Sequence, residues 1–145
     1  MTQIDARGPR FGAAIATVVL ALAVAAGSGS LGTILMAWQA VAFGLGAFLG
    51  LQAQPYGVIY ARVVKPRLSG PVPLEDAAPP RFAQAVGFGF AAVAVLGVVV
   101  GSSAVFTVAA SFALAAAFLN AVFALCLGCE MFLLLQRLRA GVTRR

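Results

Sequence analysis

The chain contains no histidine and few acidic groups, with four Asp and Glu against ten Lys and Arg in 145 residues. Without histidine, a histidine-ligated haem, a histidine-bound catalytic zinc and a serine–histidine hydrolase are excluded. Charged residues make up only 10% of the chain, whereas a soluble domain carries about 25%. No ionisable residue lies deep in the long apolar runs, although proton-coupled transport usually needs a carboxylate there. The composition is that of a membrane protein, with the lipid bilayer as its first partner.

Two long stretches carry no charged side chain, residues 11–61 and residues 82–129. A helix needs about 20 apolar residues to cross the hydrocarbon core, so each stretch has room for two crossings. Gly and Ser cluster at residues 27–30 and 101–103, where they favour tight reversals of the chain. The sequence therefore predicts an all-α membrane protein with four transmembrane helices, at about residues 10–26, 32–52, 82–100 and 105–135.

The basic residues indicate how these helices are oriented. All ten lie outside the predicted spans or at their edges, before the first, between the second and third, and after the fourth. Short loops rich in Lys and Arg stay in the cytoplasm. We therefore expect a bacterial inner-membrane protein with both termini and the central loop in the cytoplasm. Each basic side chain near anionic lipid gains about 1 kcal/mol, so the bilayer accounts for the positive charge and no nucleic-acid partner is expected.

Residues 5–11 (DARGPRF) recur as residues 76–82 (DAAPPRF), at an offset of 71 residues. This recurrence predicts two helical hairpins, with repeat units of about 5–70 and 76–140 inside a single domain spanning 1–145. Because each hairpin crosses the membrane twice, the two should be parallel and related by an axis along the membrane normal. A cleaved signal peptide is the competing interpretation of the first segment, but cleavage would remove half of the first repeat.

The Pro-Arg-Phe sequence in both copies suits a helix entrance, because proline is tolerated in the first turn and arginine can reach the headgroups. A sharper alternative is that Arg10 and Arg81 form a paired anion site. The central segment 53–81 is rich in proline, which predicts an extended tether. Its first part, residues 56–62, is expected to continue the second helix as an amphipathic interfacial segment. We expect Trp38 to serve packing and Asn120 to form a hydrogen bond between helices.

The only two cysteines, Cys126 and Cys129, are three positions apart and precede Glu130. Redox dithiols, half of a zinc site and inert buried cysteines all give such a pair. The length of the fourth helix puts the pair at its cytoplasmic end, where disulfides tend to be transient and catalytic or sensing. On a regular helix the two Cβ atoms lie about 5–6 Å apart, too far for a disulfide. Oxidation therefore requires a local distortion, which Gly128 could supply.

The depth of each cysteine along the predicted fourth helix suggests its role. Cys129, nearer the cytosol, is expected to meet a partner thiol, and Cys126 to resolve the mixed disulfide. Glu130 is either a charge that makes the neighbouring thiol less reactive unless Arg137 or a loop arginine neutralises it, a base that takes its proton, or an interfacial residue paired with an arginine.

The helix entrances, the run EDAAPPRFAQ (75–84), FLNA (118–121) and CLGCE (126–130) together resemble the bacterial membrane family catalogued as domain of unknown function 4395. The resemblance covers nearly the whole chain, and CLGCE is similar to the family's signature. It implies a small multi-pass protein, common in actinobacteria, without an established activity. It also implies a thioredoxin-like or sulfurtransferase partner, because such genes often neighbour the family's genes. The likeness to vitamin K epoxide reductase is architectural only, because those enzymes use additional loop cysteines and the outer face.

The leading hypothesis is a membrane thiol–disulfide or sulfur-transfer partner that uses Cys126, Cys129 and Glu130 and needs no cofactor. One alternative is a structural scaffold that docks a soluble partner through its basic central loop and tail. Another is a metal-binding protein whose two thiolates are completed by a second copy of the chain. The sequence leaves the substrate, the electron acceptor and the oligomeric state open.

Overall fold

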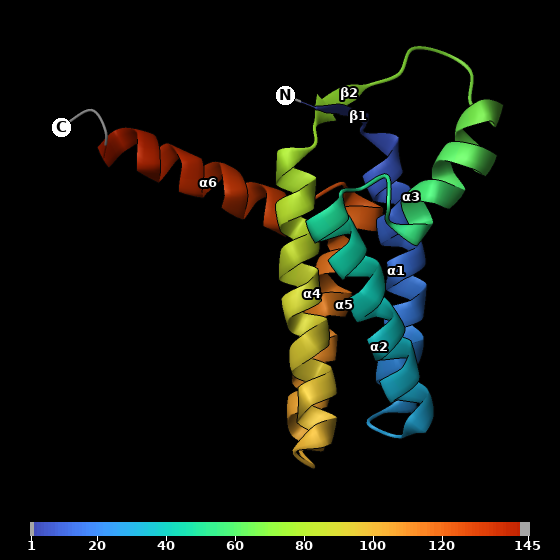
Figure 1. Cartoon of the computed structure of the whole chain (residues 1–145), viewed down its shortest axis with the longest axis vertical. Helices are drawn as coiled ribbons and strands as arrows, with labels where there is room; N and C mark the ends of the chain where they lie inside the picture. The colour runs from blue at the N-terminus through green and yellow to red at the C-terminus, as the bar shows by residue number, and fades with distance from the viewer. Residues whose placement is uncertain (1, 143–145) are drawn as a thin grey trace.

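The computed structural model describes residues 2–142, in which four long helices stand side by side (Figure 1). Each is long and apolar enough to cross a membrane by length and composition. They are α1 (Arg7–Ala26), α2 (Ser30–Gly44) with its π-helical extension η1 (Leu45–Leu49), α4 (Ala78–Val99) and α5 (Ser103–Phe123). The prediction of a four-helix, all-α membrane-type protein is confirmed at this level. The first three helices end within three residues of their predicted carboxyl ends.

Both predicted reversals are found at the same end of the bundle (Figure 1). Gly27 has φ of 68° and Gly101 has φ of 74°, a left-handed conformation that glycine adopts without steric cost. After the second reversal, the Ser102 hydroxyl accepts a hydrogen bond from the backbone N–H of Val105 at 3.4 Å. It thereby caps the start of α5.

Small side chains fill the core, where α1 packs on α2 and α5, and α4 packs on α2 and α5. Alanines dominate its buried positions, and the large fully buried side chains are few. Lipid supplies no hydrophobic drive between helices, so close approach of backbones stabilises such a bundle. Most of the large apolar side chains point outward instead, as expected of helices that face lipid. The fully buried large residues are Leu20, Met36, Gln39 and Phe106.

A short two-stranded ribbon lies at the other end of the bundle, opposite the reversals (Figure 1). Strand β1 (Gln3–Asp5) pairs antiparallel with β2 (Leu74–Asp76). Two further backbone bonds flank the ribbon, Ala6 N–H to the Pro73 carbonyl at 2.9 Å and Ala77 N–H to the Thr2 carbonyl at 3.0 Å. These strands were not predicted from the sequence. They join the two segments that share the DA-x-x-PRF pattern.

Asp5 and Asp76, which are 71 residues apart in the chain, make equivalent hydrogen bonds at the two ends of the ribbon. Asp5 accepts a hydrogen bond from the Arg7 N–H, and Asp76 accepts the equivalent bond from the Ala78 N–H, both at 3.1 Å. Each carboxylate thereby satisfies a free N–H at the beginning of a long helix, α1 or α4. The repeat units 5–70 and 76–140 stay a prediction.

The central segment departs from the sequence-based expectation. The second helix does not continue through residues 56–62, because the chain turns at Gly50, where φ is 103°. It restarts as α3 (Pro55–Ile59) and continues as η2 (Tyr60–Val64) and η3 (Lys65–Arg67). Residues 68–73 have no regular secondary structure and residues 74–76 form β2, and this is the part that corresponds to the predicted extended tether. Tyr56 and Tyr60 are buried, with Tyr60 lying against Gly8 of α1.

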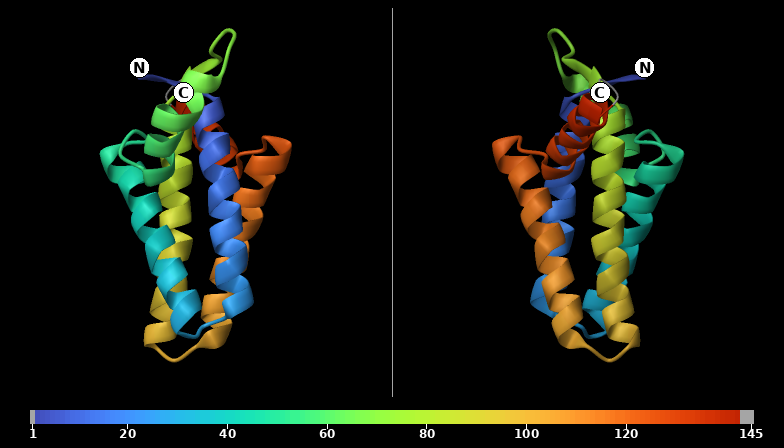
Figure 2. Two further views of the ribbon diagram at one scale, coloured as in Figure 1. Left: turned by 90° about the vertical axis from the view of Figure 1, so that its right-hand side faces the viewer. Right: turned by 90° about the vertical axis from the view of Figure 1, so that its left-hand side faces the viewer.

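The predicted fourth helix, residues 105–135, is two helices. α5 ends at Phe123, Ala124 adopts a left-handed conformation with φ of 55°, and α6 (Leu127–Val142) begins three residues later. α6 runs sideways out of the bundle, on the opposite side from α3 (Figures 1 and 2). The prediction of one continuous helix is wrong. Residues 124–126 contain no Gly or Pro, so the sequence carries no signal for the break.

Gly128 brings α6 into contact with α4. A Cβ at this position would lie 2.6 Å from the Cα of Ala83, so only glycine allows the approach. We expect Gly128→Val to lower stability by about 2 kcal/mol through overpacking, measured as the thermal unfolding midpoint in detergent. Gly89→Ala is the matched control, because a Cβ there meets nothing within 4 Å. An unchanged midpoint for Gly128→Val would show that α6 is not held at this contact.

Asp5 joins the amino-terminal strand to two helical segments. Its carboxylate receives Arg7 Nε and an Arg7 terminal nitrogen, each at 3.0 Å, and the Tyr60 hydroxyl at 2.8 Å. The Arg7 hydrogen bond is the main cause that lowers the pKa of Asp5 to about 2; burial opposes it and the Tyr60 hydroxyl adds to it.

This carboxylate gives a pH-dependent prediction. Because the folded-state pKa lies below the ordinary value of 3.8, the stabilisation is present above about pH 4 and is lost as the pH falls toward 2. Asp5→Asn should cost about 1 kcal/mol at pH 7, after solvent screening, and the difference from the parent should shrink in acid. Thermal unfolding midpoints between pH 3 and pH 7 measure this. Tyr60→Phe, which removes one of the hydrogen bonds, should cost less. A pH-independent loss for Asp5→Asn would contradict the assignment.

Candidate functional site

Cys126 and Cys129 form a disulfide at the start of α6, with their Cα atoms 5.2 Å apart. Cys126 directly precedes the first residue of α6, and its Sγ accepts a hydrogen bond from the Cys129 N–H at 3.3 Å. The sulfur therefore takes the place that a serine or aspartate side chain occupies at a helix amino terminus. The distortion that permits the disulfide lies at residues 124–126, before the helix. From the sequence, this distortion was expected at Gly128, but Gly128 lies inside α6.

The position of Cys126 has an electrostatic consequence. The unpaired N–H groups and the positive end of the helix dipole lie at the beginning of α6, and both stabilise a negative sulfur. Cysteines at such positions are the reactive ones in thiol chemistry. Cys129 lies one turn into the helix, where its own N–H is used by Cys126. Both side chains are half-buried, so exposure does not separate them.

A cavity of about 530 Å³ adjoins the disulfide, between α1, α4, α5 and the first turn of α6. Small side chains of the three long helices, such as Ala13, Ala83 and Ala113, line part of it, together with Phe43 of α2, Phe90 and Phe112. Polar side chains lie in the lining as well. They are Arg10, Glu75, Gln84, Asn120 and Glu130. The cavity, called the disulfide pocket below, combines a mostly apolar wall with a few polar groups, as small-molecule sites do.

The polar groups of the disulfide pocket differ in their partners. Gln84 Oε1 accepts a hydrogen bond from Gln54 Nε2 at 3.1 Å. Asn120 has no hydrogen-bond partner among the residues that the structure describes, so the expected helix–helix bond is not formed. Glu75 has its pKa raised by burial and, to a smaller extent, by the negative charge of Asp5.

Glu130 is exposed, and within residues 2–142 its carboxylate has no ion-pair partner. The interpretation in which it pairs with an arginine therefore does not describe this part of the chain. Its backbone N–H donates to the Cys126 carbonyl at 3.0 Å, as the first turn of α6 requires. The carboxylate thus lies beside Cys129 at the pocket lining without neutralising any basic group.

The two arginines of the Pro-Arg-Phe entrances lie in different surroundings. Arg81 donates to the carbonyls of Ala47 at 3.1 Å and Phe48 at 3.4 Å, near the end of η1. It therefore satisfies carbonyls that a helix end leaves free. Arg10 lines the disulfide pocket. Only Arg10 is placed to act on a molecule in that pocket.

A polar network between α2 and α3 was missed from the sequence. Trp38 Nε1 donates to the Tyr56 hydroxyl at 3.0 Å, and that hydroxyl donates to Gln39 Oε1 at 2.9 Å. Gln39 is completely buried, and its Nε2 has no partner among the described residues. A glutamine inside an apolar span was the available signal, because polar groups in lipid need partners. Trp38 was expected only to pack.

This network gives a prediction for Tyr56, which packs beside Gly12 of α1. Tyr56→Phe removes the hydroxyl from Trp38 and leaves the whole Gln39 amide buried and unpaired. We expect a loss of about 2 kcal/mol, the cost of buried groups without partners, measured by thermal unfolding in lipid nanodiscs. Trp38→Phe should cost less, because the Tyr56–Gln39 bond survives. If both variants lose the same stability, the hydrogen bond between Tyr56 and Gln39 does not contribute to the stability of the protein.

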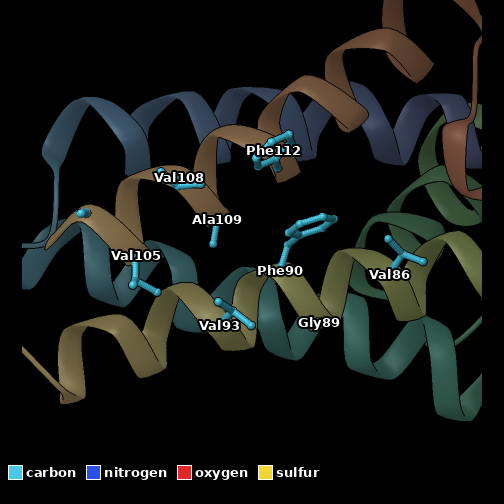
Figure 3. A pocket seen from close by; sticks show the side chains of 9 residues that line it. Val86, Gly89, Phe90, Val93, Val105, Val108, Ala109 and Phe112 are labelled. Atoms are coloured by element: carbon cyan, nitrogen blue, oxygen red, sulfur yellow. The ribbon is translucent and has the colours of Figure 1, made fainter. Parts of the chain in front are cut away.

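A second cavity, of about 670 Å³, follows α4 and α5 (Figure 3). Its lining is apolar throughout, and we call it the α4–α5 groove. The lining residues are Val86, Gly89, Phe90, Val93, Ala104, Val105, Val108, Ala109 and Phe112. Three of them, Val86, Phe90 and Phe112, also line the disulfide pocket. The Phe90 and Phe112 rings stack with their centroids 5.9 Å apart. The groove and the pocket therefore share a wall.

Metal ligands do not gather in the part of the chain that the structure describes. Within residues 2–142 no three His, Cys, Asp or Glu side chains are grouped so that they could hold a metal ion. The two sulfurs are bonded to each other.

Four membrane-length apolar helices with a disulfide-linked CxxC at the start of a projecting helix define a small multi-helix protein of membrane type. Residues 4–137 match the model of the family described as a domain of unknown function (DUF4395), and the chain belongs to that family. The resemblance found from the sequence motifs is thereby confirmed. No curated protein and no solved structure matches the chain.

Proposed function

We propose that this protein is a membrane thiol–disulfide exchange protein in which Cys126 and Cys129 alternate between disulfide and dithiol. The observation that carries the proposal is the bonded pair at the amino terminus of α6, where Cys126 Sγ accepts the Cys129 N–H. A cavity with polar groups lies directly beside it. A structural disulfide inside a closed core would need neither the helix amino terminus nor the cavity.

The roles of the two thiols follow from the position of the helix. In the reduced protein, the N–H groups at the start of α6 stabilise a thiolate at Cys126. This thiolate attacks a partner disulfide, releases one partner thiolate and forms a mixed disulfide. Cys129 then attacks the Cys126 sulfur, and the second partner thiolate leaves. The protein loses two electrons and two protons, and the partner gains them. These roles are the reverse of those expected from the sequence, because α6 begins after Cys126 instead of running through it.

Glu130 takes the proton of Cys129 in this scheme, because its carboxylate is exposed and directly follows that residue. The partner is a thioredoxin-like protein; a sulfurtransferase would use the same Cys126 sulfur as the acceptor of a transferred sulfur atom. The protein needs no metal for this exchange.

The proposed location is the bacterial inner membrane, with both termini and the central segment in the cytoplasm. The basic residues near β1, in segments 62–67 and in α6 belong to elements at one end of the bundle (Figure 1), which the positive-inside rule assigns to the cytoplasm. The paired contacts of Asp5 and Asp76 support a further proposal, that residues 5–70 and 76–140 are parallel repeats of one hairpin.

The test of the proposed function is to trap the mixed disulfide. With reduced full-length protein in nanodiscs and an oxidised thioredoxin-like protein, Cys129→Ser should accumulate a covalent complex through Cys126, and Cys126→Ser should accumulate about tenfold less because its remaining thiol lacks the helix terminus. Non-reducing gels measure both. A matched control carries Leu125→Cys with both native cysteines replaced by serine, since Leu125 is exposed but precedes the helix.

Three results would contradict the proposal. The first is equal trapping by all three variants. The second is no trapping by any of them. The third is a complex that persists when both cysteines are serine but is lost when Arg62, Lys65 and Arg67 are neutralised, which would favour the scaffold function.

A further inference from the structure

The disulfide pocket and the α4–α5 groove adjoin each other at three residues that line both, Val86, Phe90 and Phe112. The groove lies along helices that are long and apolar enough to span the bilayer, and its lining has no charged residue. It meets the pocket at Val86 and at the Phe90–Phe112 stack. Figure 3 shows the Phe90 ring reaching from α4 into the space beside α5, and Phe112 on α5. A long apolar chain lying in the groove would therefore bring an attached headgroup to the wall of the disulfide pocket.

The charges of the pocket limit what this headgroup can be. Arg10 is the only basic residue in the lining, and it is accompanied by two carboxylates, Glu75 and Glu130. A phosphate headgroup would meet as much repulsion as attraction there. A neutral group with carbonyl oxygens suits the site better, because Asn120 and Arg10 offer N–H donors for which no partner is found among the described residues. A flat ring also suits the aromatic wall at Phe90 and Phe112, where offset stacking is favourable.

We infer that this site binds a membrane quinone, with its ring in the disulfide pocket and its isoprenoid tail in the α4–α5 groove. The inference rests on the proposed function, with the exchange running in its reverse direction: a reduced thioredoxin-like protein gives two electrons to the disulfide, and the resulting dithiol passes them on. A quinone is a class of lipid-soluble molecule that accepts two electrons. The pocket volume of about 530 Å³ lies in the usual range for small-molecule sites.

The electron transfer balances between dithiol and quinone. The Cys126 thiolate adds to a ring carbon of the quinone, and a sulfur–carbon bond forms. Cys129 then attacks the Cys126 sulfur, so that the sulfur–carbon bond breaks and the disulfide forms. The electron pair stays on the ring, which takes up the two protons given by the thiols and leaves as the quinol. Arg10 and Asn120 donate to the ring oxygens, where negative charge develops during the addition.

The test uses reduced full-length protein in nanodiscs and two probes, a fully substituted benzoquinone with a ten-carbon tail and the same ring without a tail. We expect one quinol per disulfide formed, followed by the ultraviolet absorbance of the quinone and by thiol counting. The tailed quinone should react at least tenfold faster than the tailless ring. Replacing both cysteines with serine should abolish quinol formation.

Two tryptophan variants of α5 test the groove. Val108→Trp fills the groove and should slow the tailed quinone about tenfold, while exchange with the thioredoxin-like protein is unchanged. Val122→Trp is the matched control, since Val122 is equally exposed on α5 but lines neither cavity. It should react with the tailed quinone as the parent does.

The outcomes separate the inference from the function on which it rests. No quinol from a protein that still exchanges with the thioredoxin-like protein would overturn the quinone site and leave the proposed function intact. Equal rates with and without a tail, or a normal rate for Val108→Trp, would overturn the groove assignment. A co-purified phospholipid that the tailed quinone does not displace would identify the groove as a lipid site instead. Failure of exchange itself would overturn the proposed function.

Discussion

The break after Phe123 determines what the two thiols can do. Had α5 continued, as its apolar sequence permits, Cys126 and Cys129 would be two side chains on one face of a regular helix, too far apart to bond. The left-handed conformation of Ala124 ends that helix, and the Leu125 N–H returns to the Leu119 carbonyl at 3.2 Å. A new helix then begins, with Cys126 at its free amino terminus. The disulfide, the orientation of α6 and one wall of the pocket all depend on this turn.

The sequence predicts the bundle well, because the physics of membrane crossing acts on composition. Charge-free stretches and Gly/Ser clusters locate four helices and two reversals. It does not predict the Ala124 break, since alanine favours helix and carries no turn signal. It also misses the ribbon from Gln3 to Asp76, which pairs residues distant in the chain. The Cys126–Cys129 pair could be selected as the candidate site from its motif, whereas the cavity beside it could be found only from the positions of α1, α4 and α5.

The ribbon of β1 and β2 has a consequence for how the chain assembles. Its second strand ends at Asp76, after the whole of the first hairpin and the central segment have been made. During synthesis, α1 and α2 are therefore in place before their amino-terminal strand has a partner. The bonds from Ala6 to Pro73 and from Ala77 to Thr2 then close a loop that contains the entire first hairpin. α4 begins at Ala78, directly after the closing bond of Ala77, so the same strand that completes the first hairpin sets the starting point of the second.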